Sequence, residues 1–92
     1  MKKIIYKYQI PAQDKFTLEL PESATFLSVQ YQELSGPVMW MLVPAPGYAA
    51  KTVMHTFRVL PTGLPFSDWA MLSYMGTWQS DRLVWHLFEE VS

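Results

Sequence analysis

The closing part of the chain, residues 74–89, constrains the fold more than any other segment. Its sequence, YMGTWQSDRLVWHLFE, places two aromatic-rich runs around a short polar turn. This pattern predicts two antiparallel strands joined by a tight turn. The second strand has apolar residues on both faces, so it must be covered on both sides. A chain of 92 residues has little material for such cover.

Composition places the chain among compact globular domains. Half of its residues are hydrophobic and 15% are aromatic, which is too apolar for a disordered chain. Charges and prolines interrupt the sequence too often for a membrane protein. The length predicts a single β domain over residues 1–92. Because there is no cysteine, disulfides are excluded and the core itself must stabilise the fold.

The chain is neither strongly basic nor strongly acidic. The formal net charge is −1, from seven Lys and Arg against eight Asp and Glu, so no overall field would hold a polyanion. Lys2, Lys3 and Lys7 form a local basic group, which is typical of an edge strand that resists aggregation. The apolar positions of this N-terminal segment alternate with polar ones and do not resemble a signal peptide. We therefore expect a cytoplasmic protein.

Alternation with a period of two predicts seven strands, separated mostly by prolines or glycines. They cover residues 4–10, 16–20, 25–32, 38–43, 52–60, 72–79 and 82–89. We expect the first two to form a hairpin, and the last two to form another. In the third strand, Leu27, Val29 and Tyr31 should face inward. The fold class is therefore all-β, a seven-stranded antiparallel sandwich or partly open barrel.

Residues 61–72, PTGLPFSDWAML, form the long connection between predicted strands. Two prolines and a glycine argue against a full helix, although Ser67 could cap a single helical turn. Leu64, Phe66, Trp69 and Leu72 make this loop too apolar to extend into solvent. We expect it to fold over one face of the sheet.

Catalytic and cofactor-binding patterns are absent from the sequence. The two histidines, His55 and His86, fall inside predicted strands without an acid at a motif spacing. The one acid–base constellation that remains is His86 with Asp81 or Glu89. Two histidines without cysteine are too few for a zinc site, and isolated glycines do not form a phosphate-binding loop. We expect no enzyme, no metal and no cofactor.

Aromatic residues share the predicted inward side of their strands, which favours a core role over display. They are Tyr6, Tyr8, Tyr31, Trp40, Trp78 and Trp85. If these residues fill the core, the opposite faces of strands 38–43 and 83–88 point outward. The candidate interaction surface then consists of Met39, Met41, Val43, Val84, His86 and Phe88. Its cover is the 61–72 loop, a second copy of the chain or a protein partner, and the sequence leaves these alternatives open.

Six segments, in their order and spacing, resemble a known family. They are residues 15–21 (KFTLELP), 26–30 (FLSVQ), 38–44 (VMWMLVP), 57–65 (FRVLPTGLP), 74–79 (YMGTWQ) and 83–89 (LVWHLFE). Over nearly its whole length the chain resembles short uncharacterised proteins encoded by tailed bacteriophages and prophages. The resemblance implies an accessory protein of the host-cell cytoplasm, and it brings no catalytic residues.

These observations lead to a hypothesis with two alternatives. We expect a noncatalytic accessory protein that acts by protein–protein contact, and the resemblance to phage proteins suggests inhibition of a host or defence protein. The first alternative is a self-assembling virion or assembly component, which would form closed homo-oligomers. The second is a weak binder of single-stranded nucleic acid through Lys2, Lys3, Lys7 and Arg58. We expect no membrane partner.

Overall fold

The computed structural model describes residues 1–48 and 50–91, and it confirms an all-β fold. Each predicted strand occurs within two residues of its expected bounds, because prolines, glycines and polar turns separate the apolar runs. A single 3-10 turn, η1 (Trp69–Met71), precedes the sixth strand. The strands are β1 (Lys3–Gln9), β2 (Lys15–Pro21), β3 (Thr25–Gln32), β4 (Gly36–Pro44), β5 (Thr52–Pro61), β6 (Leu72–Ser80) and β7 (Leu83–Glu90).

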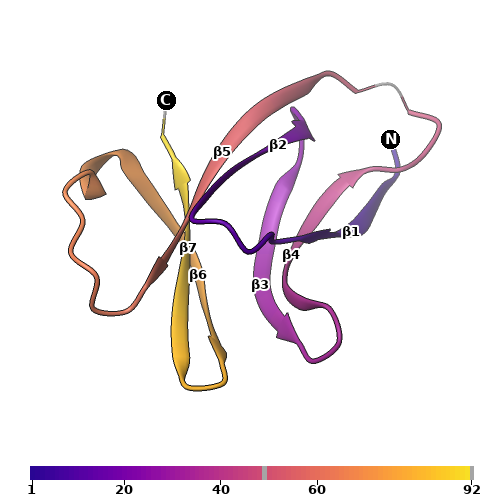
Figure 1. Ribbon diagram of the computed structural model, residues 1–92. Coiled ribbons are helices and arrows are strands. Elements are labelled where there is room, and N and C mark those ends of the chain that lie inside the picture. The colour runs from indigo at the N-terminus through magenta and orange to yellow at the C-terminus, as the bar shows by residue number, and fades with distance from the viewer. Residues whose placement is uncertain (49, 92) are drawn as a thin grey trace.

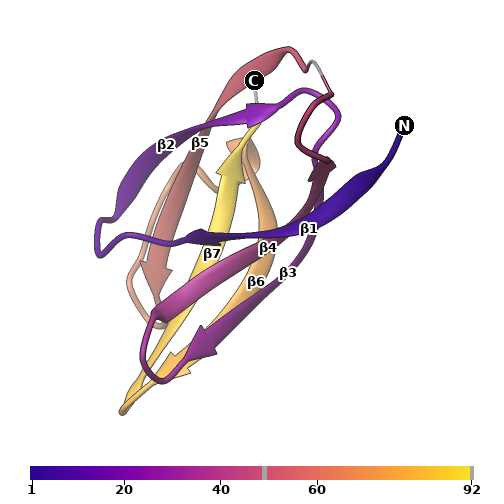
Figure 2. The same ribbon diagram turned by 90° about the vertical axis from the view of Figure 1, so that its right-hand side faces the viewer.

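The strands form two antiparallel sheets that face each other (Figure 1). Sheet A has the order β1-β4-β3, and sheet B has the order β2-β5-β7-β6. Among residues 1–48 and 50–91, no strand of one sheet pairs with a strand of the other, so the fold is a sandwich. In Figure 2, sheet A lies toward the viewer and β5, β6 and β7 lie behind it. Within residues 1–48 and 50–91, no helical segment could span a lipid bilayer.

The expected hairpin of β1 and β2 is wrong. β1 pairs with β4 in sheet A, whereas β2 pairs with β5 in sheet B. The chain crosses between the sheets at residues 10–14, where the Ile10 N–H donates to the Pro37 carbonyl and the Val59 N–H donates to the Asp14 carbonyl. This turn lacks the Asn-Gly or Asp-Gly pair that favours a tight hairpin. Alternation therefore identified both strands but not their partners.

The expected hairpin of β6 and β7 is confirmed. Ser80 pairs with Leu83, so Asp81 and Arg82 form a two-residue turn. Asp81 has a φ of 55°, in the left-handed region that aspartate tolerates better than most residues.

The core lies between the inner faces of the two sheets, and buried residues from both contribute to it. The Phe16 and Phe57 rings, on paired strands of sheet B, are stacked with centroids 5.1 Å apart. β3 and β6 approach closely, since a Cβ atom on Gly76 would lie 2.8 Å from Cγ2 of Val29. The buried cluster contains Ile10, Phe16, Leu20, Met39, Met41, Val43, Phe57, Val59, Trp78 and Leu87.

Met39, Met41 and Val43 are buried in this core, so their predicted outward orientation was wrong. Trp40 and Leu42 lie on the outer face instead. Residues 38–43 are apolar at every position, so the pattern does not distinguish the two faces of the strand. The Trp40 indole N–H donates to Oε1 of Gln30 over 3.1 Å on the outer face, which gives this ring a polar contact that the core could not supply.

A bulge in β3 also changes which residues face the core. Phe26 pairs with Met41 and Ser28 pairs with Trp40, so the register shifts at Leu27. Phe26 and Val29 pack against the core, whereas Leu27 is exposed. The expected inward orientation of Leu27 was therefore wrong, because one extra residue reverses the alternation.

The sandwich is thin and incompletely closed. Its extents are 43 × 32 × 17 Å, and its radius of gyration of 14.0 Å exceeds the 12 Å or so that is typical of a chain of this length. Tyr6 lies on the inner side of the edge strand β1 but remains 51% exposed. On the same strand, burial raises the pKa of the Tyr8 hydroxyl above its usual value, and the neighbouring Tyr6 adds to this rise to a smaller extent. Two thin sheets thus leave several large apolar residues uncovered.

Candidate binding surface

The loop between β5 and β6 lies on the outer side of sheet B, away from sheet A (Figure 1). Both of its ends are tied to β7 or the residue after it. The Thr62 N–H donates to the Val84 carbonyl over 3.0 Å, and the Val91 N–H donates to the Met71 carbonyl over 2.8 Å. Asp68, not Ser67, occupies the N-cap position of η1, and no side chain caps the turn. The loop therefore has a defined path along the sheet.

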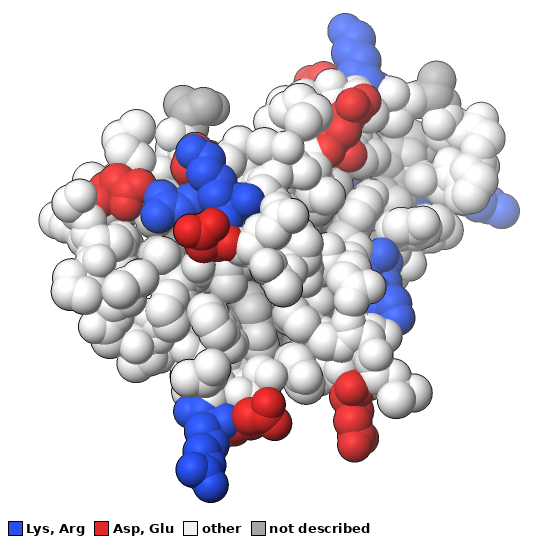
Figure 3. Space-filling model, viewed as in Figure 1, with Lys and Arg blue, Asp and Glu red and all other residues white. Residues whose placement is uncertain are grey.

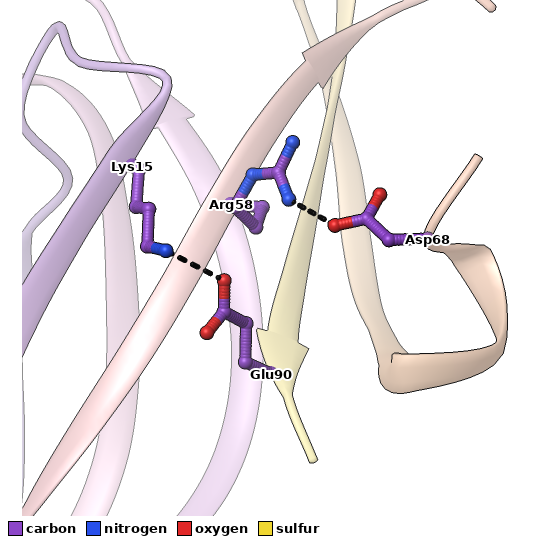
Figure 4. Close-up of polar contacts among 4 residues, drawn as sticks. All are labelled: Lys15, Arg58, Asp68 and Glu90. Atoms are coloured by element: carbon purple, nitrogen blue, oxygen red, sulfur yellow. Dashed lines mark hydrogen bonds and ion pairs between the residues drawn. The ribbon is translucent and has the colours of Figure 1, made fainter. Parts of the chain in front are cut away.

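Two ion pairs lie on this side of sheet B (Figure 4). Arg58 Nη1 donates to Oδ2 of Asp68 over 2.6 Å and so joins β5 to the loop. Lys15 Nζ lies 3.2 Å from Oε2 of Glu90 and joins β2 to β7. The hydrogen bond from Arg58 holds the pKa of Asp68 below its usual value. The loop is thus fixed near its middle as well as at its ends.

Three aromatic rings pack together where the loop meets the sheet. The Phe88 ring centroid is 6.0 Å from that of Phe66 in the loop and 5.6 Å from that of Tyr74 on β6. The first pair is tilted and the second is edge-to-face, and both geometries are favourable for aromatic rings. The loop thereby covers part of the outward face of β7, which is one of the three covers that the sequence left open.

The apolar side chains of the loop nevertheless remain in solvent, contrary to expectation. Their exposed fractions are 53% for Leu64, 37% for Phe66, 68% for Trp69 and 58% for Met71, and Tyr74 beside them is 59% exposed. We name Leu64, Phe66, Trp69, Met71, Tyr74 and Phe88 the loop surface. Clustered exposed apolar side chains of this kind mark interaction sites more often than structural ones.

Val84, His86 and Phe88 lie on the outer face of β7 and are partly exposed, as the alternation indicated. His86 makes two hydrogen bonds there, one between Nε2 and Oγ1 of Thr62 at 2.7 Å and one between Nδ1 and Oγ1 of Thr77 at 2.8 Å. The Tyr74 hydroxyl in turn contacts Oγ1 of Thr77 at 2.5 Å. His86 therefore links the start of the loop to β6.

The suggested acid–base pair of His86 with Asp81 or Glu89 is wrong. The His86 ring contacts threonine hydroxyls, and Glu89 instead pairs with Nδ1 of His55 on the inner side of sheet B. Successive residues of a strand point to opposite faces, which separates His86 from Glu89. Among the described residues, no group of three or more His, Asp or Glu side chains could hold a metal ion.

A pocket of about 520 Å³ opens beside the loop surface. Its walls are the crossing turn at residues 11–14 and the loop segment Leu64–Phe66. Val59, Leu60, Trp78 and Trp85 from sheet B line it, together with Tyr31 from sheet A. The volume falls within the range of about 300–1,000 Å³ that is usual for ligand sites. Figure 3, viewed as in Figure 1, shows a surface without charged residues between the charged groups at its upper left and those at its lower edge.

The cations considered for nucleic-acid binding do not form one groove. Lys3 and Lys7 belong to β1 of sheet A, whereas Arg58 belongs to β5 of sheet B and is paired with Asp68. Lys7 Nζ donates to Oε1 of Gln32 over 3.1 Å. A backbone-tracking site needs a continuous basic path, and these residues do not supply one.

Sequence reasoning missed the exposure of Trp69, Met71 and Tyr74. The available signal was a tryptophan and a methionine beside Ser67 and Asp68, in a segment broken by prolines. Such a segment cannot alternate its residues between core and solvent as a strand does, so some of its apolar side chains must point outward.

Comparison with known proteins gives one result. No curated protein and no solved structure matches the chain. A family model described as a domain of unknown function, DUF7352, matches residues 1–92. Because the match spans the full sequence, the chain belongs to the DUF7352 family.

Proposed function

We propose that this protein is a noncatalytic accessory protein that acts by protein–protein contact, and that the loop surface is its contact site. The observation that supports this proposal is the exposure of Trp69 and Met71 on a loop that is fixed to the sheet, beside the exposed Tyr74 on β6. Aromatic residues and methionine are enriched in protein interfaces, and tryptophan and tyrosine often dominate binding energy.

The anchoring of the loop favours tight contact. Arg58 and the backbone hydrogen bonds of Thr62 and Val91 hold the loop before any partner arrives. A partner would therefore bind an ordered surface and lose less conformational entropy than if it had to order the loop.

The loop surface is smaller than a standard interface, so neighbouring residues must also take part in the contact. The loop surface has four aromatic side chains, which bury about 150–250 Å² each, and two aliphatic ones, all partly exposed, so it offers on the order of 500 Å². A standard interface buries about 800 Å² per partner. Neighbouring residues such as Val84 and the rim of the pocket would complete the contact area.

The resemblance to phage proteins extends the proposal to a partner class and a compartment. A small inhibitor of a host or defence protein in the cytoplasm would act by covering its target, and covering requires no catalytic residues. The loop surface suits such a role because it is apolar at its centre and carries paired charges at its margin.

Affinity capture with matched variants tests the proposal. The tagged protein is used to capture partners from cells that express it, alongside a Trp69→Ser, Met71→Ser double variant and an Ile5→Ser control. Ile5 is 63% exposed on sheet A, so the control removes comparable apolar area from another face. We expect a partner in stoichiometric amount with the parent and the control, and none with the double variant. Retention by the double variant would reject the loop surface as the site.

Self-assembly is the second candidate, and the outer face of sheet A favours it. Ile5 is exposed there, and Trp40 and Leu42 are only partly covered. A second copy packed on this face would cover all three side chains. Light scattering distinguishes the candidates, because self-assembly gives a closed oligomer of the purified protein whereas the first proposal gives a monomer.

A further inference from the structure

We propose that the pocket beside the loop binds a proline-rich peptide segment in the polyproline II conformation, with a basic residue next to the prolines. This site goes beyond the proposed contact through the loop surface, with which it shares only Leu64 and Phe66. Three features of the pocket support this site: the residues that line it, the pairing of the backbone beside it and the charges on its rim.

The lining is aromatic and apolar, with few polar groups. Tyr31, Phe66, Trp78 and Trp85 supply four aromatic rings. Gln13, Asp14, Arg58 and Ser80 are the polar residues among those that line it. Aromatic-lined grooves are the usual receptors of polyproline II segments, because the peptide is already extended before it binds and loses little entropy.

On its β5 and β7 side, the pocket offers no strand edge for recognition by strand addition, because both strands lie inside sheet B. The Val59 N–H already donates to the Asp14 carbonyl, and Pro61 has no N–H to offer. Trp85 lies on β7, between Pro61 of β5 and Trp78 of β6. A ligand there must be held by side-chain packing, which suits a polyproline II segment because its own backbone remains solvated.

The charges on the rim of the pocket indicate which kind of residue should lie next to the prolines of the peptide. Arg58 is paired with Asp68 at 2.6 Å. Among the described residues Asp14 makes no ion pair, so the rim carries one carboxylate that is not neutralised. A lysine or arginine beside the proline run would complement it.

Calorimetric titration of the complete chain tests this inference. The probe is a short peptide with one arginine next to a run of prolines. Its two controls replace the arginine with glutamate, or the prolines with glycine and serine. We expect saturable binding of the probe, weaker binding of the glutamate peptide and no binding of the glycine–serine peptide.

Protein variants locate the site. Tyr31→Ala, at a 40% exposed position on the pocket wall, should raise the Kd about tenfold. Asp14→Asn should raise it roughly threefold for the arginine peptide alone. Leu64→Ser gives a second wall variant if Tyr31→Ala does not fold, and Tyr48→Ala, which lines a different pocket, should change nothing.

Three outcomes would overturn the inference. They are no saturable binding of the probe, equal binding of the glycine–serine peptide, and an unchanged Kd in both wall variants. A failure here leaves the captured-partner result intact, since Trp69 and Met71 do not line the pocket. Conversely, loss of capture without loss of peptide binding would separate the two sites.

Discussion

Arg58 Nη1 donates a hydrogen bond to Asp68 Oδ2 over 2.6 Å, and this contact joins β5 to the middle of the loop that carries Trp69 (Figure 4). Because the bond lowers the pKa of Asp68, its stabilising effect is fully present above the ordinary pKa of an aspartate. The effect is lost as the pH falls through the lower, folded-state pKa. At neutral pH the carboxylate is therefore ionised and the loop is held.

Asp68→Asn should loosen the loop without unfolding the sandwich. The amide cannot replace the charge-assisted bond, so amides of residues 64–71 should exchange faster with solvent at neutral pH. Hydrogen exchange followed by mass spectrometry measures this. Glu90→Gln, which breaks the other ion pair, serves as the control and should leave loop exchange unchanged. Unchanged exchange in Asp68→Asn would show that the ion pair does not hold the loop.

Gly76→Ala should destabilise the domain by roughly 1–3 kcal/mol, because the new methyl group overpacks the contact between β3 and β6. Its Cβ would lie 2.8 Å from Cγ2 and 3.0 Å from Cβ of Val29. The double variant Gly76→Ala, Val29→Ala should recover part of this loss, because the closer clash, with Cγ2, is removed while the contact with Cβ stays. Urea unfolding of the four proteins in this cycle checks the prediction, and strict additivity would contradict it.

Met41→Lys and Phe88→Lys should behave differently. Met41 is buried, so a lysine there would place an unpaired charge in the core and should prevent cooperative folding. Phe88 is partly exposed, so a lysine can reach solvent there. Its cost should be about 1–3 kcal/mol, from the lost contacts with Phe66 and Tyr74. Circular dichroism with thermal melting checks both variants. Normal folding of Met41→Lys would refute the placement of Met41 in the core.

Neutral His86 should carry its proton on Nε2. The Thr62 hydroxyl lies 3.3 Å from the Val84 carbonyl and donates to it, so the same oxygen accepts from Nε2–H of His86. Nδ1 then accepts from the Thr77 hydroxyl. Nitrogen-15 chemical shifts of the ring distinguish the tautomers. A protonated Nδ1 in the neutral ring would contradict this direction of the hydrogen bonds.

The positions of the strands could be predicted from the sequence because proline and glycine punctuate them, but their partners and faces could not. The run at residues 38–43 is apolar throughout, so its two faces look equal until Trp40 is seen bonded to Gln30 on the outside. The bulge at Leu27 has no local signature, because it depends on pairing with β4. β1 and β2 separate into different sheets, which alternation alone does not reveal.

The candidate site was predicted only in part, for a related reason. Val84, His86 and Phe88 lie outward because the final hairpin fixes their alternation. The exposure of Trp69 and Met71 depends on the path of an irregular loop, which the Arg58–Asp68 pair and two backbone hydrogen bonds to β7 and Val91 determine together. Contacts between residues so distant in sequence follow from the fold and not from local pattern.

A map of amide chemical shifts in the isotope-labelled protein, recorded as the captured partner is added, tests directly whether the loop surface is the contact site. If the loop surface is the contact site, the largest changes will fall in residues 62–74 and 84–90. The amides of β1, β3 and β4 will then change little. Changes concentrated on sheet A, with the loop unaffected, would show that the partner binds elsewhere.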